Sequence, residues 1–203
     1  MFLEPVPVNC LDETQYQGKN TLGSTIDIYR EKDEFPELEN VQLALLGIKE
    51  DRGSTDNKGC SDGTDEVRQA LYPLFNHWKD LKIADIGDIY PGNRISDTYY
   101  AVNQVLSELM KHHIVPIVIG GSQDMTYPMF QVYEALGKLV NITAIDPVFD
   151  LGNDDDTLNS STYLSRIILH EPNFLFNFTN IGYQTYYVDN DSIELMKQLL
   201  FDV

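Results

Sequence analysis

Short apolar runs alternate with amphipathic stretches along the chain from about residue 40 onward. The runs are rich in β-branched residues and end near Gly or Asp, which is typical of strands buried in a parallel sheet. The stretches between them repeat apolar residues three or four positions apart, which indicates helices with one buried face. The predicted strands cover residues 41–47, 81–87, 114–119, 140–145 and 173–181, and the predicted helices cover 65–72, 98–113, 124–136, 160–169 and 192–201.

This alternation contains no hairpin signal, so it predicts parallel βαβ units in a three-layer α-β-α fold with a mainly parallel sheet. Thr64 is the expected cap of the first helix, and Asp191 or Ser192 the expected cap of the last. Residues 1–40 are polar and irregular and are predicted to be an arm or a packed lead-in, with 41–203 as the α/β domain. The chain stops after a helix, where another strand is expected. Either the fold ends there or the chain is part of a longer protein.

The candidate site lies where two predicted strands end, because functional residues of parallel α/β sheets gather at the carboxyl ends of the strands. One strand is followed by Gly120-Gly121-Ser122-Gln123-Asp124 and the next by Asp146-Pro147-Val148-Phe149-Asp150. Carboxylates crowded at one edge suit a hard cation, so Asp146 and Asp150 are candidate metal ligands. The alternative interpretation is that both only accept N–H bonds from their own loop.

These two motifs resemble the N-terminal metal motifs of the ureohydrolase superfamily, which includes arginase, agmatinase and formimidoylglutamase. The family pattern is Gly-Gly-x-His, followed about one βα unit later by Asp-x-His-x-Asp, and then by an Asn-Ser loop that residues 159–161 resemble. The similarity extends over residues 41–203, and formimidoylglutamase-like members resemble the chain most. It implies an arginase-like fold, homo-oligomers such as trimers or hexamers, manganese if the site is active, and a small amino-acid-like ligand. It also implies that Gln123, Asp124, Asn159 and Ser160 lie near that ligand.

The departures from the family pattern concern the metal ligands. Gln123 stands where the first motif has its His, and Val148 stands where the second motif has its His, while the family's later Asp-x-Asp motif would fall beyond Val203. A binuclear manganese site generates hydroxide by lowering the pKa of a bridging water, and it needs those ligands. We therefore expect a non-catalytic domain, a pseudoenzyme that binds or assembles. The alternative is a metal-dependent hydrolase of linear C–N bonds, guanidino or formimino, with a rearranged site completed by residues beyond 203.

The charge and composition of the chain narrow the range of possible binding partners. The chain has 14 Lys and Arg against 32 Asp and Glu, a net charge of −18, which disfavours nucleic acid and anionic membranes. It has no apolar run long enough to span a membrane and no signal peptide at its start, so a cytoplasmic location is expected. Cys10 and Cys60 are expected to be reduced there; a disulfide between them is the alternative. The Asp154–Asp156 run lacks EF-hand spacing and indicates a solvated loop. The four histidines are expected to be structural.

Overall fold

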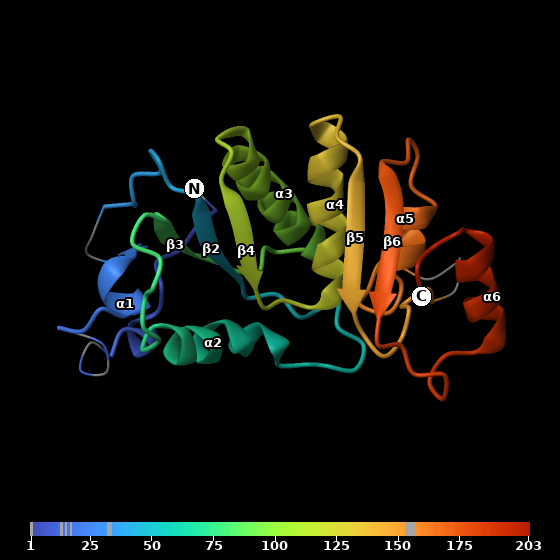
Figure 1. Cartoon of the computed structure of the whole chain (residues 1–203), viewed down its shortest axis with the longest axis horizontal. Coiled ribbons are helices and arrows are strands. Elements are labelled where there is room, and N and C mark those ends of the chain that lie inside the picture. The colour runs from blue at the N-terminus through green and yellow to red at the C-terminus, as the bar shows by residue number, and fades with distance from the viewer. Residues whose placement is uncertain (1, 13, 15, 17, 32–33, 153–156) are drawn as a thin grey trace. The chain divides into compact units, whose positions relative to one another are not determined.

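The computed structural model describes every residue except 1, 13, 15, 17, 32–33 and 153–156 (Figure 1). The chain divides into two compact units. Unit 1 consists of Met1–Arg52 and Asp56–Ser122, and unit 2 consists of Gly53–Thr55 and Gln123–Val203. The predicted Asp154–Asp156 loop lies outside the described residues, because these exclude 153–156.

Unit 1 is built on a four-stranded parallel sheet with the order β1-β3-β2-β4. β2 is almost completely buried, as its continuous apolar run predicts. β4 is last in this order, and an outer position of a sheet tolerates a proline such as Pro116, which lies opposite Ala44. The strands are β1 (Asp27–Ile28), β2 (Leu43–Ile48), β3 (Ile83–Ile89) and β4 (Val115–Ile119).

The helices of unit 1 follow the predicted apolar spacing. In the long helix α3, Val102, Leu106 and Leu109 are buried, which is the expected face of an amphipathic helix. The predicted Thr64 cap is wrong, because α2 begins at Gly63, two residues before the predicted start, and its cap position is Asp62; Thr64 is buried inside the first turn. The helices are η1 (Val8–Cys10), α1 (Leu22–Thr25), η3 (Cys60–Asp62), α2 (Gly63–Leu71) and α3 (Ile95–Lys111).

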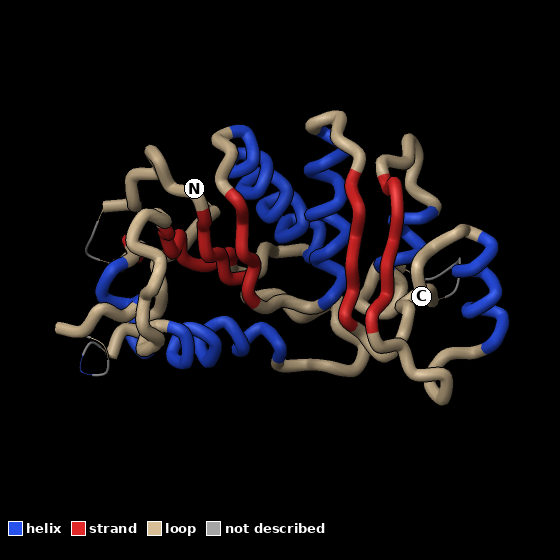
Figure 2. Tube along the Cα trace, in the orientation of Figure 1, coloured by secondary structure: helices blue, strands red, loops and turns tan. Residues whose placement is uncertain are grey.

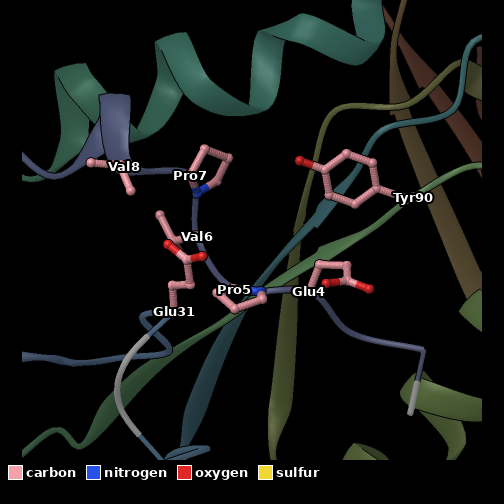
Figure 3. Close-up of a pocket in the computed structure, with 7 residues that line it drawn as sticks. All are labelled: Glu4, Pro5, Val6, Pro7, Val8, Glu31 and Tyr90. Atoms are coloured by element: carbon pink, nitrogen blue, oxygen red, sulfur yellow. The ribbon is translucent and has the colours of Figure 1, made fainter.

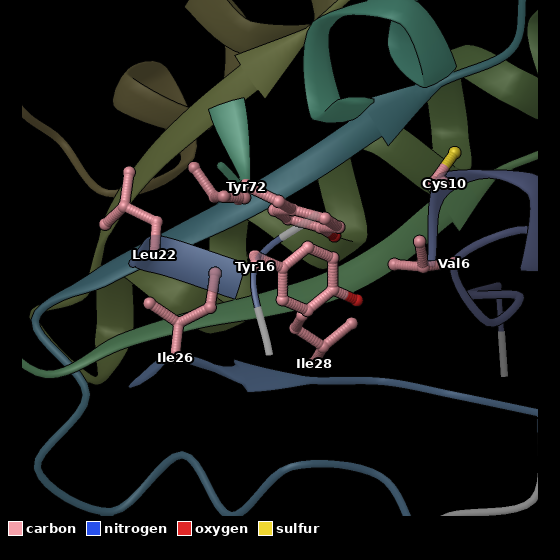
Figure 4. Packing of buried hydrophobic residues seen from close by; sticks show 8 residues of the cluster. Val6, Cys10, Tyr16, Leu22, Ile26, Ile28 and Tyr72 are labelled. Atoms are coloured by element: carbon pink, nitrogen blue, oxygen red, sulfur yellow. The ribbon is translucent and has the colours of Figure 1, made fainter. Parts of the chain in front are cut away.

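The first 40 residues contribute to the core of unit 1 (Figure 4). Tyr16 is buried and meets Tyr72 edge to face, with ring centroids 5.9 Å apart. Leu22, Ile26 and Ile28 are buried in the same cluster, and β1 pairs in parallel with β3. The segment thus packs against the residues that follow it, while the predicted domain boundary at residue 40 stays a prediction.

A buried ion network joins α2 to β3 inside unit 1. Arg68 is fully buried and donates to both carboxylate oxygens of Asp85, at 2.9 and 3.0 Å, and to Asp88 Oδ1 at 2.5 Å. The Tyr72 hydroxyl also donates to Asp85, at 2.9 Å. Gly47 on β2 makes room for this network, because a Cβ at that position would lie 1.8 Å from Asp88 Oδ1.

Unit 2 contains a pair of parallel strands, β5 and β6 (Figure 2). Ile142 lies opposite Phe178 in this pair. Phe178 is buried with Phe130, Leu164 and Met196 in the core of this unit. The last helix begins earlier than predicted, and its cap is Asp189, whose carboxylate accepts from the Ser192 amide at 2.8 Å. The elements are η4 (Gln123–Met125), α4 (Thr126–Ala135), β5 (Val140–Ile145), α5 (Tyr163–Ile168), β6 (Leu175–Ile181) and α6 (Asn190–Gln198).

The predicted α/β class with a mainly parallel sheet is confirmed, since every pairing between the named strands is parallel. Cys10 is buried, Cys60 is partly exposed, and neither forms a disulfide with a described residue. None of the helices formed by the described residues is both long and apolar enough to cross a membrane.

Candidate functional site

All six candidate site residues belong to unit 2. Gln123 and Asp124 open the short helix η4, Asp146 and Asp150 lie in the loop that follows β5, and Asn159 and Ser160 precede α5. The carboxyl end of β5 therefore delivers the acidic motif, as the sequence predicts.

The two motif carboxylates have different surroundings. Asp146 Oδ1 accepts from the Val148 amide at 2.9 Å, which is the loop-bracing role that the alternative interpretation predicted. Asp150 has a left-handed backbone, with φ +52°, and a partly buried side chain. Burial, together with the charge of Asp146, raises the pKa of Asp150 to about 7. The two carboxylates thus interact electrostatically, and neither forms an ion pair with a described cation.

Gln123 stands at the entrance to η4, and its side chain is tied to a tyrosine. Its Nε2 donates to the hydroxyl of Tyr163 at 3.3 Å. Tyr163 is buried, and this burial raises the pKa of its hydroxyl to about 12. A side-chain amide and a protonated phenol are much weaker ligands for manganese than an imidazole nitrogen, so this pair does not replace the imidazole of the family motif.

The remaining candidates fix loops. Asp124 is fully buried, and Gly53 lies so close that a Cβ there would be 2.3 Å from Asp124 Oδ2. Asn159 Oδ1 accepts from the Ser161 amide at 2.9 Å. The Ser160 amide donates to the Gly53 carbonyl at 2.8 Å, and Ser160 Oγ accepts from the Thr55 amide at 3.0 Å. The two bonds of Ser160 join segments more than 100 residues apart, and the local sequence carries no signal for them.

A second loop, at the carboxyl end of β6, supports the acidic motif. Asn180 is buried, and its Nδ2 donates to the Val148 carbonyl at 3.1 Å. The Gln184 amide donates to the Pro147 carbonyl at 2.8 Å, and Tyr183 packs on Phe149 with ring centroids 5.0 Å apart. Sequence reasoning missed Asn180; its position near the end of a predicted strand was the available signal.

Two of the histidines have acidic partners of their own. His170 bridges Tyr127 and Glu134, with distances of 2.9 Å from Nδ1 and 2.7 Å from Nε2, and His112 lies 3.1 Å from Glu108 on the exposed side of α3. Among the residues that the structure describes, no group of three or more His, Cys, Asp or Glu side chains is arranged to hold a metal ion. Two carboxylates without imidazole do not fit the binuclear manganese centre that the resemblance implies.

Unit 1 has a separate cavity near the carboxyl end of β3 (Figure 3). It encloses about 410 Å³ and is lined by Glu4, Glu31 and Tyr90 together with the proline-rich stretch around Pro5 and Pro7. Burial and the charge of Asp88 raise the pKa of the Tyr90 hydroxyl. Sequence reasoning did not single out any of these residues.

Comparison with known proteins gives a consistent assignment. The formimidoylglutamase of Photorhabdus laumondii is 24% identical over 183 residues, which are 83% of this chain and 58% of that protein. The formimidoylglutamase of Hahella chejuensis is 31% identical over 136 residues, 62% of this chain and 41% of that protein. The crystal structure of Trypanosoma cruzi formiminoglutamase with Mn²⁺ superposes with a TM-score of 0.74 at 18% identity, covering 91% of this chain and 64% of that one.

The chain thus spans less than two thirds of the length of each of these proteins. The superposition shows a shared fold, and the arginase family model matches residues 41–203, which is most of the chain. The protein belongs to the arginase family.

Proposed function

We propose that this chain is a non-catalytic member of the arginase family that acts as a binding or assembly module. The observation that carries the proposal is the state of the two positions where the family motifs have imidazole. Gln123 is hydrogen-bonded to Tyr163, and Val148 has no side-chain donor atom. The Val148 backbone is itself engaged at both ends, with its amide on Asp146 and its carbonyl on Asn180.

The remaining carboxylates are poorly matched to a metal ion. Asp146 already accepts a hydrogen bond from its own loop, which fixes one of its oxygens. The raised pKa of Asp150, about 7, means that this carboxylate holds a proton over part of the neutral range. Metal binding must displace that proton, and this lowers the apparent affinity.

The first test is the manganese content of the purified chain after incubation with Mn²⁺ and desalting. We expect less than about 0.1 equivalent per chain by elemental analysis, because two carboxylates without imidazole give neither the affinity nor the geometry for a stable site. One or two equivalents, lost in Asp146→Ala, would contradict the proposal.

A matched variant makes this test sharper. Gln123→His together with Val148→His restores two imidazoles beside the two carboxylates. We expect this double variant to bind Mn²⁺ at least about tenfold more tightly than the natural chain, because imidazole is a much better ligand than an amide or an alkyl group. Equal metal content in both proteins would show that the missing imidazoles do not explain a lack of metal.

The second candidate is a hydrolase of formimino or guanidino C–N bonds with a rearranged site that residues beyond 203 complete. It is supported by the electrostatic pairing of Asp146 with Asp150 and by the formimidoylglutamases among the relatives. An assay for ammonia, formamide or urea release from such compounds tests it. Activity that survives Asp146→Ala and Asp150→Ala would exclude a role for this site in it.

The proposal includes three further features that the resemblance or the sequence implies. A small amino-acid-like ligand, a homo-oligomer and a cytoplasmic location remain predictions for this chain. The oligomeric state can be measured without knowing the ligand, by light scattering coupled to size-exclusion chromatography.

A further inference from the structure

A second cavity of unit 1 lies at the amino ends of β1 and β3. It encloses about 370 Å³, a volume within the range of small-molecule sites. Asp27 and Ile83 are the first residues of β1 and β3, and both line it. Because these strands are parallel, the cavity is at their amino ends, so it is independent of the proposed function at the acidic motif.

The floor of this cavity is held in place by a set of hydrogen bonds. Asn76 is 8% exposed, its Nδ2 donates to Thr25 Oγ1 at 2.9 Å, and its Oδ1 accepts from the Trp78 amide at 2.9 Å. The Asn76 amide donates to the Asn20 carbonyl at 2.9 Å, and Asn20 Nδ2 donates back to the Asn76 carbonyl at 2.8 Å. The backbone that carries Trp78 is therefore fixed before any ligand arrives, which lowers the entropic cost of binding.

The cavity presents an exposed aromatic ring beside two cations. Trp78 is 58% exposed although indole rings are usually buried, and a flat exposed indole is a stacking surface. Lys79 and Lys82 line the same cavity, and neither ammonium forms an ion pair with a residue that the structure describes. Only 14 residues of this chain are Lys or Arg, against 32 acids. Two lysines against the single carboxylate of Asp27 in one cavity therefore favour an anionic ligand.

We propose that this cavity binds a small aromatic anion, with its flat ring stacked on Trp78 and its anionic group held by Lys79 and Lys82. Asp27, which also lines the cavity, accepts a hydrogen bond from a hydroxyl or amino group of the ligand. A nucleoside monophosphate and an aromatic carboxylate both have this chemistry, and the experiment below distinguishes them.

Trp78 is the single tryptophan of the chain, so its fluorescence reports directly on the site. The intact chain is titrated with adenosine monophosphate, adenosine, ribose 5-phosphate and phenylacetate. We expect saturable quenching by adenosine monophosphate or phenylacetate with a Kd below about 1 mM, and at least about tenfold weaker binding of adenosine and ribose 5-phosphate. The former lacks the anion and the latter lacks the aromatic ring. The aromatic anion that gives saturable quenching shows whether the ligand is a nucleoside monophosphate or an aromatic carboxylate.

Variants then separate stacking from charge. Lys79→Gln with Lys82→Gln should raise the Kd at least about tenfold, while Lys111→Gln on the exposed side of α3 makes the same kind of charge change and should leave it unchanged. Trp78→Leu, followed by calorimetry, should abolish the binding. Quenching that never saturates with any probe, or equal effects of the cavity and control lysine variants, would overturn the proposal. So would saturable quenching by adenosine monophosphate together with an equal Kd for adenosine.

Discussion

Replacing Arg68 by methionine is expected to lower the free energy of unfolding by about 3–5 kcal/mol. The side chain of Arg68 is fully buried between the carboxylates of Asp85 and Asp88. Methionine fills much of the same volume but leaves two buried acids without their cation. Breaking a buried ion pair by removing one partner is costly because the remaining charge has lost its solvent and its counterion.

The two acids should respond differently to that loss. Asp85 keeps the Tyr72 hydroxyl at 2.9 Å and the Gly87 amide at 3.1 Å. Asp88 Oδ2 is buried and has no hydrogen-bond partner among the described residues, and burial already raises the pKa of Asp88. A proton taken up by Asp88 would therefore offset part of the cost, and the destabilisation should be larger at pH 8 than at pH 5.

Urea unfolding followed by the fluorescence of Trp78, which lies in the same unit, measures this effect. Arg68→Lys keeps the charge but loses the two-pronged contact with Asp85, so its loss should be smaller than that of methionine. Gln69→Met changes the exposed neighbour on α2 and should alter stability by less than about 0.5 kcal/mol. A loss below about 1 kcal/mol for Arg68→Met would contradict the importance assigned to this network.

The Arg68 network also shows where sequence reasoning ends. The apolar periodicity predicted β5 at residues 140–145, which are its observed bounds, and placed β2, β3, β4 and β6 within two residues of theirs. It did not predict β1, which lies in the segment expected to be irregular. These patterns are local, because a strand or helix shows its buried face within its own sequence. Arg68 looks like any charged residue of an amphipathic helix, and only the tertiary fold brings it to Asp85 and Asp88, 17 and 20 residues away.

In the candidate site, too, local features could be predicted from the sequence and long-range contacts could not. The sequence predicted that Asp146 and Asp150 would lie together after one strand, since both belong to a single short loop. It did not predict that Tyr163 would bind Gln123, or that Asn180 would hold the acidic loop by the Val148 carbonyl. Caps were misplaced at Thr64 and at Asp191 or Ser192, because several polar residues compete at each helix start and the backbone geometry decides among them.

Replacing Asp150 by asparagine is expected to stabilise the protein at pH 8 by about 1–3 kcal/mol. Burial, together with the charge of Asp146, raises the pKa of Asp150 to about 7 in the folded chain, well above the value of about 3.9 for an unfolded aspartate. The folded state therefore binds this proton more tightly than the unfolded state. The stabilising contribution of the protonated group is complete below about pH 4 and is lost as the pH rises through about 7.

Asparagine keeps the shape of the protonated acid and removes the charge. It also tolerates the left-handed backbone at this position, where φ is +52°. Unfolding in urea at pH 4.5 and pH 8, followed by far-UV circular dichroism, measures the expected difference: Asp150→Asn and the natural chain should have similar stability at pH 4.5 and differ at pH 8. Asp80→Asn, an exposed aspartate of unit 1, is the matched control and should show no such change between the two pH values. Equal stability of Asp150→Asn and the natural chain at pH 8 would mean that the loop relieves the repulsion between Asp146 and Asp150, as a bound cation at the acidic motif would also do.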